Sequence, residues 1–130
     1  MRSVLIAVVD DEEPVRKALG RLLRAAGLTA ECYASGQDFL DSIHRGPPSC
    51  LVLDLHMPGL SGFEVLERLR AQASRPPTIV ITGHDEPENE VRCLAAGAVA
   101  YMRKPLDDEM LLQTIEVAVG KGISGHQVRG

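Results

Sequence analysis

The side chains best suited to chemistry follow four of five short apolar runs along the chain. Asp10 and Asp11 follow the first run, Asp54 follows the third, Thr82 follows the fourth and Lys104 comes after the fifth. If these runs are parallel strands of one sheet, the side chains meet beyond the carboxyl ends of the strands, where open α/β sheets bind ligands. The pattern therefore predicts a ligand site at one edge of the sheet.

Carboxylates gathered at one edge need a positive partner. Two ionised carboxylates about 5 Å apart repel each other by roughly 3 kcal/mol at an effective dielectric constant of about 20. Either a cation lies between them or one of them takes up a proton. Magnesium suits a site with so few carboxylates, because it prefers oxygen ligands and keeps several of its waters. Lys104 adds a second, movable positive charge.

The elements that must position these residues can be read from hydrophobic patterning. Apolar runs rich in branched residues predict five strands, at Val4–Val9, Thr29–Tyr33, Cys50–Leu53, Thr78–Ile81 and Ala98–Met102. Apolar residues at helical spacing follow each run, in segments that start near Val15, Phe39, Val65, Val91 and Leu111. Strict alternation predicts an α/β fold with a mostly parallel five-stranded sheet covered on both faces by helices. We expect one domain over residues 1–119 and a flexible tail or truncated linker over residues 120–130.

Composition excludes several classes of function. The net charge is −4 and the chain has two Phe, two Tyr and no Trp, so a phosphate-gripping or base-stacking surface for nucleic acid is not expected. The first apolar run is too short for a signal peptide or membrane span, so we expect a cytoplasmic protein. Cys32, Cys50 and Cys93 match no zinc or redox spacing and are interpreted as reduced core thiols.

Four motifs carry a resemblance to a known family. They are Val-Val-Asp10-Asp11-Glu-Glu, then Leu-Val-Leu-Asp54-Leu-His-Met-Pro58-Gly59-Leu-Ser-Gly62, then Val-Ile-Thr82-Gly83, and Tyr101-Met-Arg-Lys104-Pro105. Together they resemble the receiver domains of bacterial two-component response regulators, most closely those of regulators with a helix-turn-helix DNA-binding output domain. The resemblance covers residues 3 to about 119 and implies a (βα)5 sheet with strand order 2-1-3-4-5.

The resemblance also implies a phosphoryl-acceptor site. Asp54 would be the nucleophile that attacks the phosphohistidine of a sensor histidine kinase. Asp11, Asp54 and the backbone carbonyl of His56 would hold Mg²⁺ or Mn²⁺, and Asp10 would act mainly through water. Positioning and charge neutralisation are the main requirements of phosphoryl transfer, so the residue types fit the implied reaction.

A switch is implied beside the acceptor. Lys104 would pair with the acyl phosphate, aimed by a cis peptide bond to Pro105, and the Thr82 hydroxyl would swing in to bind another phosphoryl oxygen. Tyr101 would turn inward as Thr82 moves and reshape the surface of the predicted fourth helix, fifth strand and fifth helix. Two copies would then pair through that surface to control an output domain outside this chain. The domain would not be an enzyme, apart from catalysing its own phosphorylation and dephosphorylation.

Some of these residues also have simpler interpretations. Acids commonly stabilise the first turn of a helix, which is a simpler account of Asp11, Glu12 and Glu13. Tyr101 could be a half-buried strand aromatic. His56 and His84 follow Asp54 and Thr82 by two residues, and exposed loop histidines are the simpler account of both. The alternative hypothesis is that they control how water reaches the phosphoryl group, with pH sensitivity near neutrality.

Three other functions compete with a phosphorylated switch. A magnesium-dependent phosphohydrolase of similar architecture would carry Asp-x-Asp after the first strand, whereas here Asp10 and Asp11 are adjacent, and the chain lacks a cap domain. A flavodoxin-like cofactor carrier needs a first loop that cradles phosphate, and an acidic loop would repel it. A scaffold that works without phosphorylation would not need the full set of acceptor residues.

Overall fold

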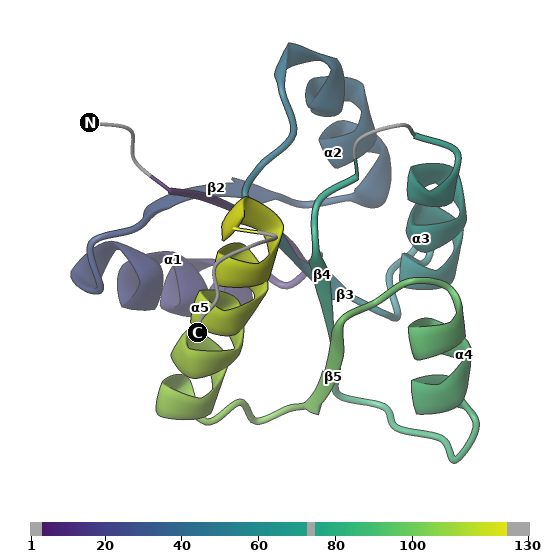
Figure 1. Ribbon diagram of the computed structural model, residues 1–130. Coiled ribbons are helices and arrows are strands. Elements are labelled where there is room, and N and C mark those ends of the chain that lie inside the picture. The colour runs from purple at the N-terminus through teal and green to yellow at the C-terminus, as the bar shows by residue number, and fades with distance from the viewer. Residues whose placement is uncertain (1–3, 73–74, 125–130) are drawn as a thin grey trace.

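The computed structural model describes residues 4–72 and 75–124, with side chains up to Gly120 (Figure 1). Strands and helices alternate along the chain. The elements are β1 (Leu5–Val9), α1 (Glu13–Ala25), β2 (Thr29–Tyr33), α2 (Gly36–Ser42), a short 3₁₀ helix η1 (Ile43–Arg45), β3 (Cys50–Asp54), α3 (Gly62–Arg70), β4 (Thr78–Thr82), α4 (Asn89–Ala95), β5 (Ala100–Arg103) and α5 (Asp108–Ser124).

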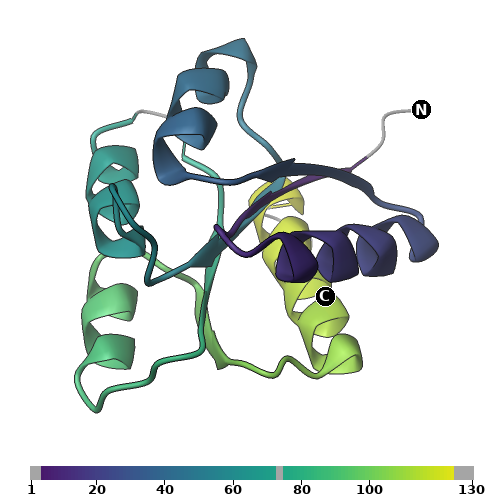
Figure 2. The same cartoon turned by 180° about the vertical axis from the view of Figure 1, so that it is seen from behind.

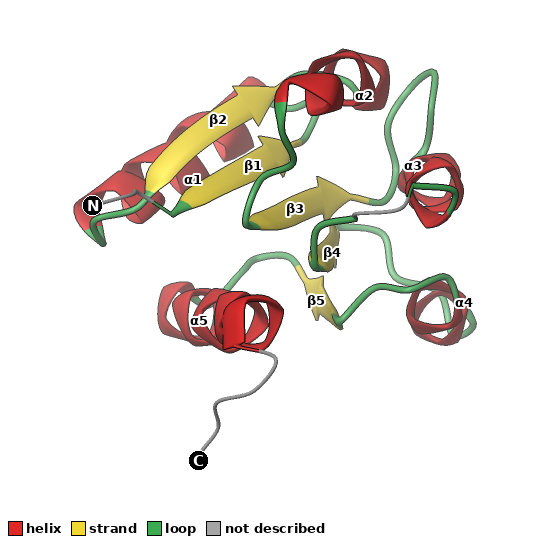
Figure 3. Cartoon of the chain, turned by 45° about the horizontal axis from the view of Figure 1, so that its top comes forward, coloured by secondary structure: helices red, strands yellow, loops and turns green. Residues whose placement is uncertain are grey.

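The five strands form one parallel sheet in the order β2-β1-β3-β4-β5, which confirms the expected fold class and strand order. Helices α1 and α5 cover one face, and α2, α3 and α4 cover the other (Figure 3). The reverse view shows the same two groups of helices on either side of the sheet (Figure 2). β3 lies in the middle, so its carboxyl end is flanked by those of β1 and β4.

The two faces of the sheet contribute to two separate hydrophobic cores. Successive side chains of a strand point to opposite faces. On the face of α2, α3 and α4, the buried strand residues include Val9, Leu53, Val80 and Tyr101. On the face of α1 and α5 they include Ile6, Val8, Val52, Ile79 and Ile81. All five residues of β3 and of β4 are buried, which explains why both runs are apolar almost throughout.

Most differences from the sequence prediction lie at the ends of elements. β5 begins at Ala100, two residues later than predicted, and extends to Arg103. The second helix is short and tightens into η1. The interpretation of Cys32 as a core thiol is wrong, because β2 is an edge strand and leaves this residue exposed. Cys50 and Cys93 are buried, as expected.

α5 is the longest helix that the structure describes. It continues to Ser124, whereas the loss of periodicity predicts a tail from Gly120 onward. The remainder of that expected tail, 125–130, lies outside the described residues. Within the described part of the chain, α5 and the other helices are too short or too polar to cross a membrane.

Candidate phosphoryl-acceptor site

The register of the sheet brings the predicted site residues together. Val9 pairs with Leu53, so the next residues, Asp10 and Asp54, lie side by side at the carboxyl ends of β1 and β3. Asp10, Asp54 and Thr82 are at most 3% exposed, although each carries a polar group. Buried carboxylates need a partner of opposite charge.

That partner is the ammonium group of Lys104. Its Nζ lies 2.9 Å from Oδ2 of Asp10, 3.2 Å from Oε1 of Glu12 and 3.5 Å from Oδ1 of Asp54. Lys104 directly follows β5. Its backbone N–H donates to the Thr82 carbonyl at 2.8 Å, which continues the pairing of β5 with β4 and positions the lysine. The Lys104–Pro105 peptide bond is cis, as the resemblance implied. The sequence therefore placed Lys104 at the correct edge of the sheet.

The electrostatics of the site leave Asp54 poorly ionised without a metal. Burial, followed by the neighbouring charge of Asp10, raises the pKa of Asp54 to about 7, although Lys104 opposes this rise. Burial alone would lower the pKa of Lys104, but the hydrogen bond to Asp10 and the charge of Asp54 raise it overall. Near neutral pH, one lysine is not enough to keep the Asp54 carboxylate fully charged.

The donor set fits a hard divalent cation. Asp10, Asp11 and Asp54 each offer a carboxylate oxygen, and these oxygens lie within 4.8 Å of one another. Asp11 is exposed while the other two are buried, so a cation held here would face water on one side. This matches the preference of magnesium for oxygen ligands and retained waters. Mn²⁺ also accepts carboxylate and water ligands.

The loop after Asp54 is held close to the site by its glycines. Gly59 follows Pro58 in a tight turn and has φ +77°, a conformation that favours glycine. Gly62 N donates to the Leu55 carbonyl at 2.9 Å, and a Cβ on Gly62 would lie 2.6 Å from the carbonyl oxygen of Asp54. The loop that contains His56 therefore folds back against the end of β3. The use of the His56 carbonyl as a metal ligand stays a prediction.

Thr82 is bonded to its own loop rather than to Asp54. Its Oγ1 donates to the carbonyl of His84 at 3.1 Å and accepts from His84 N at 3.0 Å. The rings of His56 and His84 make an edge contact, with centroids 5.4 Å apart, and both residues are exposed. The structure thus brings together the two histidines that the sequence placed beside the site.

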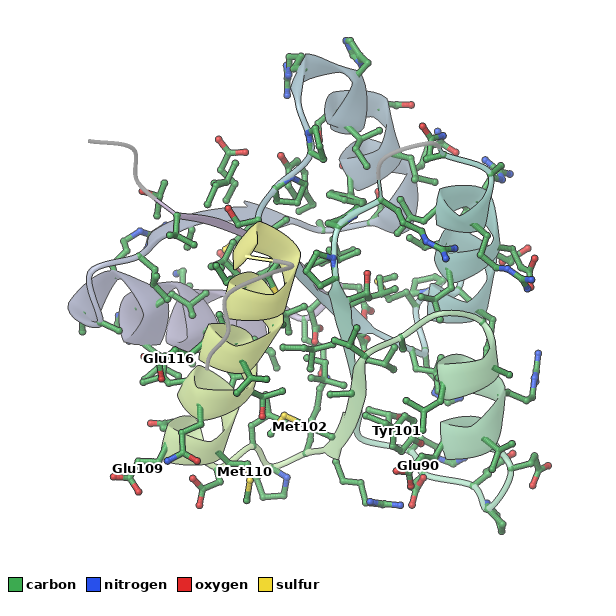
Figure 4. All side chains as sticks on the ribbon, in the orientation of Figure 1. Glu90, Tyr101, Met102, Glu109, Met110 and Glu116 are labelled. Atoms are coloured by element: carbon green, nitrogen blue, oxygen red, sulfur yellow. The ribbon has the colours of Figure 1, made fainter. Side chains whose placement is uncertain are left out.

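Tyr101 is already buried in this structure, at 8% exposure. Its hydroxyl donates to Oδ1 of Asp85 at 2.6 Å, and Arg103 Nε donates to Oδ2 of Asp85 at 2.5 Å. Tyr101 points to the α4 side of β5 and Met102 to the α5 side (Figure 4). Burial, together with the bond to Asp85, raises the pKa of Tyr101 to about 12. The inward turn implied by the resemblance is therefore not needed to bury this side chain.

Sequence reasoning missed three residues of this region. Glu12 is the N-cap residue of α1, but its side chain makes no capping hydrogen bond and instead pairs with Lys104. Asp85 and Arg103 form an ion pair whose members are 18 residues apart. The available signal was position, because Glu12 is adjacent to Asp11, Asp85 follows Thr82 by three residues and Arg103 precedes Lys104.

Comparison with known proteins decides the family. A model of the response regulator receiver domain matches residues 6–116. This chain belongs to the response regulator receiver domain family. The receiver shares 37% identity over 118 residues with the response regulator protein TodT of Pseudomonas putida, covering 91% of this chain and 52% of TodT. It shares 38% identity over 114 residues with the transcriptional regulatory protein FixJ of Bradyrhizobium diazoefficiens, covering 88% of this chain and 56% of FixJ.

A solved structure supports the same assignment. The crystal structure of FixJ-N superposes on the receiver with a TM-score of 0.84 and 36% identity, covering all of both chains. The receiver spans about half the length of the curated relatives described above. Receivers of this kind are phosphoryl-accepting switches of two-component systems.

Proposed function

We propose that Asp54 accepts a phosphoryl group from the phosphohistidine of a sensor histidine kinase in the cytoplasm, with a divalent cation held by Asp11, Asp54 and the His56 carbonyl. The observation that carries this proposal is the convergence of three carboxylate oxygens within 4.8 Å at the end of the central strand, next to Lys104. Asp54 is buried and ends the central strand β3, which supports its assignment as the nucleophile.

The residues have defined tasks in the proposed transfer. A carboxylate oxygen of Asp54 forms the new bond to phosphorus, the N–P bond of the phosphohistidine breaks, and the electron pair returns to the imidazole nitrogen. The cation, when bound, neutralises equatorial phosphoryl oxygens and keeps Asp54 ionised. Lys104 moves its ammonium from Asp10 toward the acyl phosphate, and Thr82 supplies a hydroxyl to another oxygen.

Labelling with a small phosphodonor tests this assignment. Acetyl phosphate with Mg²⁺ should add one phosphoryl group to the protein, seen by intact-mass spectrometry, and Asp54→Asn should prevent the addition. Asp41→Asn is the matched control, because Asp41 is an exposed aspartate on α2. Retention of the label by Asp54→Asn would contradict the assignment, and turnover of small phosphomonoesters would favour a phosphohydrolase.

We also propose that two phosphorylated copies pair through the face made by α4, β5 and α5, to control transcription through an output domain. Large apolar side chains are exposed on or beside these elements: Val91, Leu94, Val99, Met110 and Val117. Pairing through this face would remove some of these apolar side chains from water. Light scattering with and without a phosphoryl stand-in should show a dimer only in its presence.

A further inference from the structure

Asp85 fastens the loop between β4 and α4 to β5. It lies three residues after Thr82, and its two carboxylate oxygens accept hydrogen bonds from Tyr101 and Arg103 at 2.6 and 2.5 Å. Both donors belong to β5 and are two residues apart, so they lie on the same face of that strand. Hydrogen bonds to a charged group are about twice as strong as neutral ones. One carboxylate therefore ties the loop to the adjacent strand.

The same contacts extend to the first turn of α4. Arg103 Nη2 donates to Oε1 of Glu90 at 3.3 Å, and the guanidinium lies 5.4 Å from the centre of the Tyr101 ring. Figure 4 shows Glu90 and Tyr101 on the same side of β5. Arg103 is exposed while Tyr101 is buried, so the ion pairs form an outer cover over the phenol. Loop, strand and helix are joined at this point.

The Thr82 hydroxyl is hydrogen-bonded to the same loop. It makes two hydrogen bonds to the main chain of His84, the residue that directly precedes Asp85. A Thr82 hydroxyl that turns toward a phosphoryl group on Asp54 gives up both bonds. The loss of both bonds would free the main chain of His84, which directly precedes Asp85.

We propose that Asp85 is a positioning residue of the switch: it holds Tyr101 and Arg103 in the unphosphorylated receiver and releases both when Asp54 is phosphorylated. This inference rests on the proposed function, because the Thr82 hydroxyl needs a phosphoryl group to turn to. Release would free the Arg103 side chain on the face proposed for pairing. Tyr101 would lose its hydrogen-bond acceptor at the same moment.

Binding of a phosphoryl stand-in measures this coupling. A contact present only in the unphosphorylated form opposes conversion to the other form, so its removal tightens binding of any ligand that selects the second form. Asp85→Ala should lower the half-saturating concentration of beryllofluoride, with Mg²⁺ present, by about threefold to tenfold. Glu88→Ala is the matched control, since this exposed acid of the same loop makes no capping hydrogen bond to α4. It should bind as the parent does.

Tyrosine emission reports the contact itself. The chain has no Trp and two Tyr, so Tyr33→Phe leaves Tyr101 as the sole emitter. A carboxylate bonded to a phenol quenches emission, because the excited phenol transfers its proton to the carboxylate. In the Tyr33→Phe background, Asp85→Ala should therefore brighten emission. Saturating beryllofluoride should brighten the background protein to a similar level and change the Asp85→Ala variant little.

A double-variant cycle separates the phenol contact from general loosening of the loop. Tyr101→Phe keeps the ring but removes the donor, so it should also tighten beryllofluoride binding, and combining it with Asp85→Ala should give no further gain over Asp85→Ala alone. Full additivity would mean that the two side chains act separately and would overturn the inference.

Fluorine NMR of bound beryllofluoride distinguishes failure of the role of Asp85 from failure of the proposed function. Unchanged or weaker binding by Asp85→Ala, or emission of the Tyr33→Phe background that stays constant as the site fills, would overturn the role of Asp85. Failure of the parent to bind beryllofluoride at all would overturn the proposed function, and the inference with it.

Discussion

Replacing Asp54 by Asn should change how the stability of the metal-free protein depends on pH. In an unfolded chain an aspartate loses its proton near its ordinary pKa of 3.8, whereas burial and the charge of Asp10 hold the pKa of Asp54 at about 7 in the folded protein. Between these values the folded state binds more protons than the unfolded state. The contribution of Asp54 to stability therefore decreases as pH rises from about 4 to about 7, and then levels off.

The size of the effect follows from the pKa. Each pH unit between 5 and 7 changes the free energy of unfolding by at most about 1.4 kcal/mol. Two units would give about 2.7 kcal/mol, and water that reaches the exposed Asp11 screens part of this, so we expect about 2 kcal/mol. Asn carries no titrating proton, so the Asp54→Asn protein should lack this loss.

The assay is urea unfolding in EDTA at pH 5 and pH 8. The advantage in stability of Asp54→Asn over the parent should grow by about 2 kcal/mol between the two pH values. Asp41→Asn, which removes an exposed carboxylate, should keep the pH dependence of the parent. Added Mg²⁺ at pH 8 should remove most of the difference, because the cation stabilises the ionised carboxylate.

One result would refute this reasoning. If the advantage of Asp54→Asn in EDTA were the same at pH 5 and pH 8, the folded protein would impose no penalty on the ionised form of Asp54. The electrostatic basis of the metal requirement would then be wrong, whatever the labelling experiment showed.

Three further predictions concern the same site. In thermal melts without metal, Asp11→Ala should be more stable than the parent because carboxylate repulsion is relieved. Millimolar Mg²⁺ should raise the Tm of the parent but not that of the variant. A parent Tm that does not change with Mg²⁺ would contradict this prediction. Lys104→Ala should lower stability in EDTA by about 3 kcal/mol, because Asp10 loses its buried partner, and unchanged urea unfolding would count against it. Gly62→Ala should destabilise by about 2 kcal/mol in the same assay, since its Cβ would meet backbone atoms at 2.6 and 2.8 Å, and a neutral result would show that the loop can yield.

Much of the fold was predictable because patterning and topology depend on short stretches of sequence. The runs at Cys50–Leu53 and Thr78–Ile81 are apolar except for Thr78, and their short length and branched residues are typical of strands buried on both faces. Helical spacing between the runs predicts helical crossovers. A parallel sheet places Asp10 and Asp54 at the same edge, and the strand order that the resemblance implied makes them neighbours, as the register confirms.

The rest depended on contacts between residues far apart in the chain. Lys104 is shared by Asp10, Glu12 and Asp54, and only the path of β5 decides which carboxylate it approaches most closely. The ion pair of Asp85 and Arg103 has no sequence signature, because charged residues in loops are usually solvated. The exposure of Cys32 depended on which strands lie at the edges of the sheet, which the resemblance implied but spacing did not.

The separation of the hydrophobic interior into two cores limits how far a rearrangement has to spread. Tyr101 and Cys93 pack in the core shared with α3, whereas Leu111 and Ile115 of α5 pack on the opposite face with α1. β3 and β4, which are buried on both faces, lie between the two cores. A movement confined to α4 would therefore require repacking only of the core that it shares with α2 and α3.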